Sequence, residues 1–118
     1  MTAPPAPPGA GDVKITWDMG YPKKANGKLK LKGKAEFKNG WSSQDGNVSV
    51  VISPTGGGVP LAGIATIGNG GVWELEFDLT DFGDGKQDWD IVPSVNAWKG
   101  TGTPVVTVHG PRKTMELP

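Results

Sequence analysis

Hydrophobic and polar residues alternate one by one along several short stretches of this chain. Gly68–Leu79 (GNGGVWELEFDL) shows the pattern most clearly, after a glycine-rich turn that supplies positive φ angles. A period of two predicts a β-strand with one dry and one wet face. The dry face of this predicted strand comprises Trp73, Leu75, Phe77 and Leu79, and the wet face comprises Glu74, Glu76 and Asp78.

Lys28–Lys38 is a second alternating stretch and is rich in lysine. Its apolar positions are Leu29, Leu31, Ala35 and Phe37, and its outward positions are Lys28, Lys30, Lys32, Lys34, Glu36 and Lys38. The same period predicts a second strand with one buried face. The lysines on its wet face are either one half of a charge pairing within a sheet or a docking surface for an acidic partner.

Five further stretches predict strands: Asp12–Met19, Asn47–Ser53, Leu61–Ile67, Trp89–Trp98 and Thr103–His109. Pro93 lies inside one of them, and because proline has no N–H to donate, we expect a bulge or an unpaired position there. Trp17 and Met19 are in phase with the inward residues of the first stretch. Seven short strands separated by turn signals predict an all-β, immunoglobulin-like antiparallel sandwich.

Composition agrees with that fold class and narrows the function. The chain has 118 residues, with 19 Gly and 11 Pro, which favour turns and break helices. It has no Cys, and 12 basic residues balance 12 acidic ones. A net charge near zero gives no attraction to nucleic acid or to an anionic membrane, and no apolar run approaches a bilayer span. We expect three parts: an extended arm (1–11), a sandwich (12–110) and a tail (111–118).

Two stretches resemble bacterial and phage immunoglobulin-like domains. They are NGGVWELEF, with its glycine-rich turn before Trp73, and GDGKQDWDIV, an acidic Asp-Gly corner that leads into a strand. The resemblance covers about residues 12–110 and implies a seven-stranded sandwich in which the lysine-rich and acidic strands are neighbours. Their outward charges would then oppose one another. The chain departs from the family in two ways: the inter-sheet cysteine pair is absent, and Trp89 stands where many members have a corner tyrosine.

The acidic corner is the one candidate metal site in the sequence. Calcium needs six to eight oxygen ligands, and closely spaced aspartates in a glycine-rich loop can provide several. The candidate ligands are Asp81, Asp84 and Asp88. Their spacing differs from the EF-hand loop, and such corners are more often solvated turns, so we expect no cofactor. His109, the only histidine, has no recognisable triad or zinc partners, and we expect no enzymatic activity.

Surface aromatic residues and the prolines of the arm are the candidate partner contacts. Trp17, Trp73 and Trp89 are in phase with core positions, whereas Tyr21 and Trp41 lie in polar loops, and Val59 lies in a glycine-rich loop. Loop aromatics suit a protein interface and equally suit stacking against a sugar ring. The arm carries Pro4, Pro5, Pro7 and Pro8, which favour an extended conformation. An arm with no core of its own is expected to bind a neighbouring subunit.

Two functional readings remain open. The resemblance, the arm, the balanced charge and the absence of a recognisable signal peptide favour a capsid decoration or minor capsid protein of a phage, located on the virion and bound to capsid subunits or to its own copies. The alternative is an extracellular immunoglobulin-like or carbohydrate-binding module of a larger secreted bacterial protein. In that case residues 3–11 would be a linker.

Overall fold

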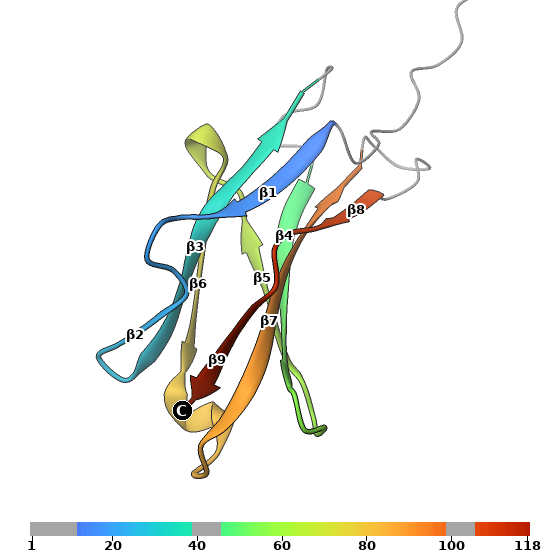
Figure 1. Cartoon of the computed structure of the whole chain (residues 1–118). Coiled ribbons are helices and arrows are strands. Elements are labelled where there is room, and N and C mark those ends of the chain that lie inside the picture. The colour runs from blue at the N-terminus through green and yellow to red at the C-terminus, as the bar shows by residue number, and fades with distance from the viewer. Residues whose placement is uncertain (1–11, 39–45, 99–105) are drawn as a thin grey trace, which may run out of the picture.

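The computed structural model of the chain is an all-β arrangement of two antiparallel sheets that face each other (Figure 1). The structure describes residues 12–38, 46–98 and 106–118. This part of the chain contains no α-helix and forms nine strands: β1 Val13–Trp17, β2 Lys23–Ala25, β3 Lys28–Phe37, β4 Gly46–Pro54, β5 Leu61–Thr66, β6 Val72–Asp78, β7 Gln87–Ala97, β8 Val106–His109 and β9 Lys113–Leu117. Two short 3₁₀ turns, Asn69–Gly71 and Leu79–Phe82, flank β6.

The four-stranded sheet, called sheet A here, is built around β3. The strand β6 pairs with one side of β3, and β1 and β2 share its other side. The strand β1 pairs with the far end of β3, from Val13 opposite Phe37 to Trp17 opposite Gly33. The strand β2 pairs with the near end, so that residues 18–22 interrupt what is otherwise one edge of the sheet.

The five-stranded sheet, sheet B, has the order β5-β4-β7, with β8 and β9 both along the far side of β7. The strand β8 pairs with residues 94–97 and β9 with residues 87–91. The segment 111–118, expected as a tail outside the sandwich, therefore contributes a strand. The cause is burial of Leu117, whose side chain is fully enclosed while Lys113 and Glu116 are exposed. That alternation spans only a few residues, too few for a prediction.

Pro93 lies at the break between β8 and β9. The register between β4 and β7 continues through it, with Val50 opposite Pro93, so the expected bulge in this ladder is absent. The carbonyl oxygen of Pro93 accepts a hydrogen bond from the N–H of Gly110, at 2.7 Å. The N–H and C=O of one strand residue point to the same side, so the missing donor of Pro93 faces this break. The unpaired position expected at Pro93 therefore lies at the break between β8 and β9.

The core lies between the two sheets and is built from the inward residues of both. Trp73 and Trp89 are buried as predicted, and Trp17 packs on the core with its ring centroid 5.4 Å from that of Trp73. Met19 was expected on the inner face of the first strand, but its side chain is 99% exposed. The reason is that β1 ends at Trp17 and the chain leaves the sheet there.

The two interrupted edges meet on one side of the sandwich. The indole N–H of Trp17, at the end of β1, donates a hydrogen bond to the carbonyl oxygen of Pro111, at 2.8 Å. Gly110 lies against Ile15, so closely that an added Cβ would come within 2.7 Å of the Ile15 Cγ2. The Lys24 ammonium donates to the carbonyl oxygen of Glu116, at 3.1 Å. Sheet A and sheet B are thus tied together along this side.

Candidate functional site

The outer face of sheet A carries a ladder of opposite charges. Three lysines of β3 lie directly opposite three acidic residues of β6 in the strand register. Lys30 and Glu76 approach to 3.8 Å and Lys32 and Glu74 to 3.4 Å between charged atoms, and the Lys28 ammonium contacts the Asp78 carboxylate. The structure therefore confirms the expected opposition of the two strands. A partner covering this face would have to remove water from charges that already satisfy one another.

The Lys28–Asp78 pair affects the ionisation of Lys28. A hydrogen bond from the ammonium to the Asp78 carboxylate, helped by the attraction between the two charges, raises the pKa of Lys28 above its ordinary value. The proton of Lys28 is therefore held more tightly in the fold than in the unfolded chain. Lys28 consequently stays protonated, and able to donate to Asp78, at neutral pH.

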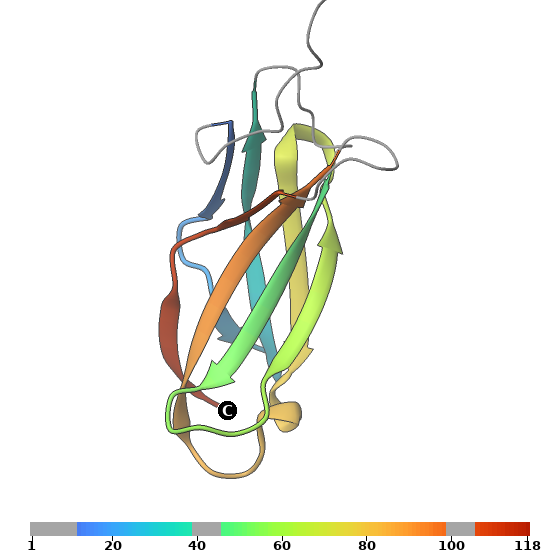
Figure 2. The same ribbon diagram turned by 90° about the vertical axis from the view of Figure 1, so that its right-hand side faces the viewer.

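The outer face of sheet B differs in that its centre holds no Asp, Glu, Lys or Arg. Figure 2 looks onto this sheet, with β5 in yellow-green at its right-hand edge. The outward residues of β4, β5, β7 and β8 alternate with the buried core residues of those strands. We call the following set the uncharged face: Asn47, Ser49, Val51, Ala62, Ile64, Thr66, Val92, Ser94, Asn96, Thr107 and His109.

Side-chain hydrogen bonds fix the middle of the uncharged face. The amide nitrogen of Asn96 donates to the Asn47 side-chain oxygen at 3.0 Å and to the Ser49 hydroxyl at 3.2 Å. The amide oxygen of Asn96 accepts from the Thr107 hydroxyl at 2.9 Å. One residue thus links three adjacent strands. Because donors and acceptors satisfy one another, these groups can be covered with little loss of hydrogen bonding to water.

His109 and Ser94 form a second polar contact on this face. The Ser94 hydroxyl and the His109 Nδ1 are 2.6 Å apart, and Ser94 is nearly buried beneath the ring. His109 ends β8, as expected for an ordinary strand-end residue. In the part of the chain that the structure describes, no three His or acidic side chains are grouped so that they could hold a metal ion. The contact between Ser94 and His109 adds a second side-chain link between β7 and β8 on this face.

The uncharged face becomes apolar toward its β5 edge. Ile64 is 69% exposed and Val51 is 43% exposed, and Ala62 lies opposite Val51 in the register. Removing large aliphatic side chains from water lowers the free energy by roughly 25 cal/mol for each Å² of apolar surface that a partner covers. Among the described residues, this corner combines exposed aliphatic surface with the absence of charge. This corner is therefore the candidate contact surface within the described part of the chain.

The structure places the expected contact residues far from one another. Tyr21 is half-buried beside the charge ladder of sheet A, at a depression of about 120 Å³ that Lys30, Lys32, Glu74 and Glu76 also line. The Lys23 ammonium lies 4.8 Å from the centre of the Tyr21 ring and occupies one of its faces. Val59 is 81% exposed in the loop that leads into β5, in sheet B. These two residues do not form one site.

The remaining expected contacts lie outside the described residues: Pro4, Pro5, Pro7, Pro8 and Trp41. The three aspartates of the acidic corner are described and exposed, on the 3₁₀ turn, in the following loop and in β7. Asp81, Asp84 and Asp88 are not brought together into a group that could hold a metal ion. None of the helical segments described is long and apolar enough to cross a membrane.

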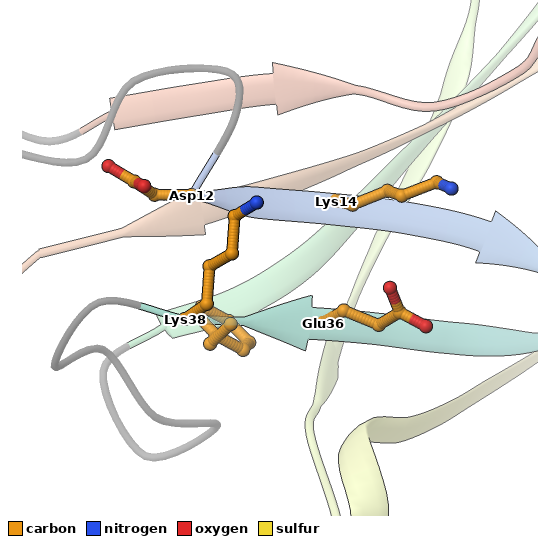
Figure 3. Close-up of a pocket in the computed structure, with 5 residues that line it drawn as sticks. Asp12, Lys14, Glu36 and Lys38 are labelled. Atoms are coloured by element: carbon orange, nitrogen blue, oxygen red, sulfur yellow. The ribbon is translucent and has the colours of Figure 1, made fainter.

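A larger depression, of about 340 Å³, lies at the ends of β1 and β3 (Figure 3). Charged side chains line most of it, and Lys14 and Glu36 are opposite each other in the strand register. Figure 3 shows the Asp12 carboxylate and the Lys14 ammonium pointing in opposite directions. The charged groups of these two residues therefore do not converge on one point of the depression.

No protein-family model matches the chain, and comparison with characterised proteins and with solved structures finds no significant similarity. The candidate surface therefore depends on the geometry alone. The uncharged face was not predicted from the sequence, because charged, aromatic and proline residues carry stronger signals than uncharged polar ones. The available signal was the outward phase of two strands, in which Asn47, Ser49, Val51 and Ile64 occupy solvent positions without one charge.

Proposed function

We propose that this chain is a non-catalytic interaction subunit that binds a larger protein assembly through the uncharged face of sheet B. The observation that carries the proposal is the difference between the charged outer face of sheet A and the uncharged centre of sheet B, whose outward charges, Asp88, Asp90 and Glu116, lie at one end. Lysine and acid pairs cover sheet A, while the centre of sheet B presents hydrogen-bonded amides and hydroxyls beside exposed Val51 and Ile64. Depletion of charge is the compositional mark of an interface core.

We further propose that the sandwich is immunoglobulin-like. Counting β1 with β2 and β8 with β9 as single interrupted strands reduces nine strands to seven. Strands one, two and five of that count then form sheet A, and strands four, three, six and seven form sheet B. Immunoglobulin-type sandwiches also pair their second strand with their fifth and their third with their sixth. The pairings of β3 with β6 and of β4 with β7 support the proposal.

The assembly that we propose is a phage capsid, with the chain as a decoration or minor capsid protein on the virion. Support comes from the resemblance of NGGVWELEF and GDGKQDWDIV to phage immunoglobulin-like domains and from the proline-rich arm. Many copies on a regular lattice would make a contact that is weak in one subunit effective in the whole particle. The alternative, a secreted carbohydrate-binding module, has less support because Lys23 occupies one face of the Tyr21 ring.

The first experiment is mass spectrometry of purified particles and of cell-free medium from the source. Many intact copies per particle support the capsid proposal, and occurrence only inside a longer secreted polypeptide rejects it. The contact surface is then tested by Val51→Glu, with Val72→Glu, which lies opposite Lys34 on the outer face of sheet A, as the matched control. We expect the first variant alone to reduce the number of copies bound. Equal binding of both variants would exclude the uncharged face.

Deletion of residues 1–10 tests the arm separately. The deletion should leave the sandwich folded, because the described core is built from residue 13 onward. Attachment to particles should fall sharply, since the arm is proposed to lie along neighbouring subunits. Full attachment of the shortened chain, measured on the same particles, would remove the arm from the mechanism without affecting the proposal for sheet B.

A further inference from the structure

The strand β5 is an open edge of sheet B. Within the described residues it is hydrogen-bonded to β4 alone, from Asn47 opposite Thr66 to Ile52 opposite Leu61. In an edge strand, every second residue directs its N–H and C=O away from the sheet, so one side of β5 presents unpaired backbone groups. In Figure 2 this strand lies at the right-hand margin of the sheet.

The sequence of β5 lacks the features that usually protect an edge from pairing. Its six residues, LAGIAT, include no charge and no proline, and Ile64 points outward. The neighbouring edge β6 carries Glu74, Glu76 and Asp78 on its outer side. If β6 paired with β6 of another copy about Leu75, Glu74 would lie opposite Glu76, and like charges directly opposite are destabilising. Of these two edges, β5 is the one that can pair with itself about its centre without opposing like charges.

We propose that β5 pairs antiparallel with β5 of a second copy of this chain. The inference rests on the proposed function, since it names the partner at the edge of the same uncharged face. In the register centred on Gly63, Ala62 of each copy lies opposite Ile64 of the other. Each copy also contributes Val51, which lies opposite Ala62 in its own sheet. Six aliphatic side chains then form one apolar patch across the seam, and no charged pair is opposed.

The proline-rich arm is a poorer occupant of this edge. An added strand offers the N–H groups of every second residue to its neighbour. Prolines fall on both phases of the arm, Pro4 and Pro8 on one and Pro5 and Pro7 on the other. Either phase therefore lacks two donors over a short stretch. A second β5 contains no proline and therefore lacks no N–H donor. Because both strands are uncharged, no repulsion between like charges opposes their pairing.

The test is sedimentation velocity of the full chain across a concentration series from low micromolar to near millimolar. The wild type should form dimers as the concentration rises. Ile64→Lys introduces two ammonium groups at the seam and should weaken the dimer at least about tenfold. Met19→Lys is the matched control, because Met19 is equally apolar, 99% exposed and far from β5 in the fold, and it should dimerise like the wild type.

Amide hydrogen exchange gives a second measurement that needs no variant. Exchange of the β5 amides that face the open edge should slow as the concentration rises, while the amides of β6 should show no such change. Circular dichroism checks that Ile64→Lys remains folded, which its exposure allows. A wild type that remains monomeric throughout, or an Ile64→Lys variant that dimerises like Met19→Lys, would overturn the inference.

Failure of this inference is distinguishable from failure of the proposed function. A monomeric chain that still binds particles through Val51 overturns the self-pairing and leaves the docking proposal standing. A chain that dimerises through β5 but is found on no particle supports the self-pairing and removes the capsid assignment. A monomeric chain whose attachment to particles is lost in Ile64→Lys would identify β5 as an edge for a different protein and would reject the second copy.

Discussion

Replacement of Leu117 by alanine tests whether the C-terminal segment belongs to the fold. The Leu117 side chain is fully buried in the core cluster, and its residue pairs with Gln87 in β7. Leucine-to-alanine changes at such positions cost about 2–5 kcal/mol, the lost transfer energy plus the cavity that remains. A domain of this size has a total stability of roughly 5–15 kcal/mol, so the variant should remain folded but visibly weakened.

The assay is urea unfolding followed by tryptophan fluorescence. With a denaturant dependence of about 1–3 kcal/mol per molar urea, a loss of about 3 kcal/mol lowers the midpoint by about 1–3 M. Glu116→Ala is the control, because its side chain is exposed one residue away in the same strand and its midpoint should barely move. Leu117→Ile, which keeps the volume, should lose less than about 1.5 kcal/mol. Equal midpoints for Leu117→Ala and Glu116→Ala would contradict the burial of Leu117 and would mean that residues 111–118 form a tail outside the sandwich.

Three further outcomes follow from particular contacts. Gly110→Ala should lower the unfolding free energy by about 1–3 kcal/mol because its Cβ would press on a core isoleucine, whereas Gly85→Ala, which meets nothing within 4 Å, should be nearly neutral in the same urea assay. A double-mutant cycle on Lys32→Ala and Glu74→Ala should give a coupling free energy between the two side chains of only about 0.2–1 kcal/mol, and this coupling should shrink in high salt. A larger coupling that does not depend on salt would contradict the exposed geometry of the pair. The raised pKa of Lys28 means that the stabilisation by Asp78 is complete below pH 10.5 and is progressively lost above it. The difference in unfolding free energy between the wild type and Lys28→Met should therefore shrink as the pH rises above 10.5. A difference that stays constant with pH would contradict the pairing.

The strands that alternate strongly could be predicted from the sequence almost residue by residue. The charges on β3 and β6 fix which face of each strand is buried, because a shift of one residue would bury five charges in β3 and three in β6. The pairing of these two strands was also predicted and is confirmed. The same reasoning failed where alternation is short: β2 and β9 have three and five residues and are held in place by β3 and β7.

The candidate surface was harder to predict, for a physical reason. An interface formed by hydrogen-bonded amides, hydroxyls and small aliphatic groups has no signature in any one residue. Its character emerges only when Asn96 is seen to satisfy groups on both neighbouring strands. Tyr21 looked like a free contact residue in the sequence, and only the fold brings Lys23 over its ring. The contact roles expected for the arm and for Trp41 stay predictions, since these residues lie outside the described part of the chain.

The tie between Trp17 and Pro111 has a defined place relative to the proposed pairing edge, β5. It lies where β1 and β8 turn away from their sheets, and it joins the two layers along the side opposite β5 and β6. In the proposed dimer this tie would therefore lie at each outer end, away from the seam, and the two subunits would be related by a twofold axis. Growth of the proposed dimer into a filament would need a second edge that pairs.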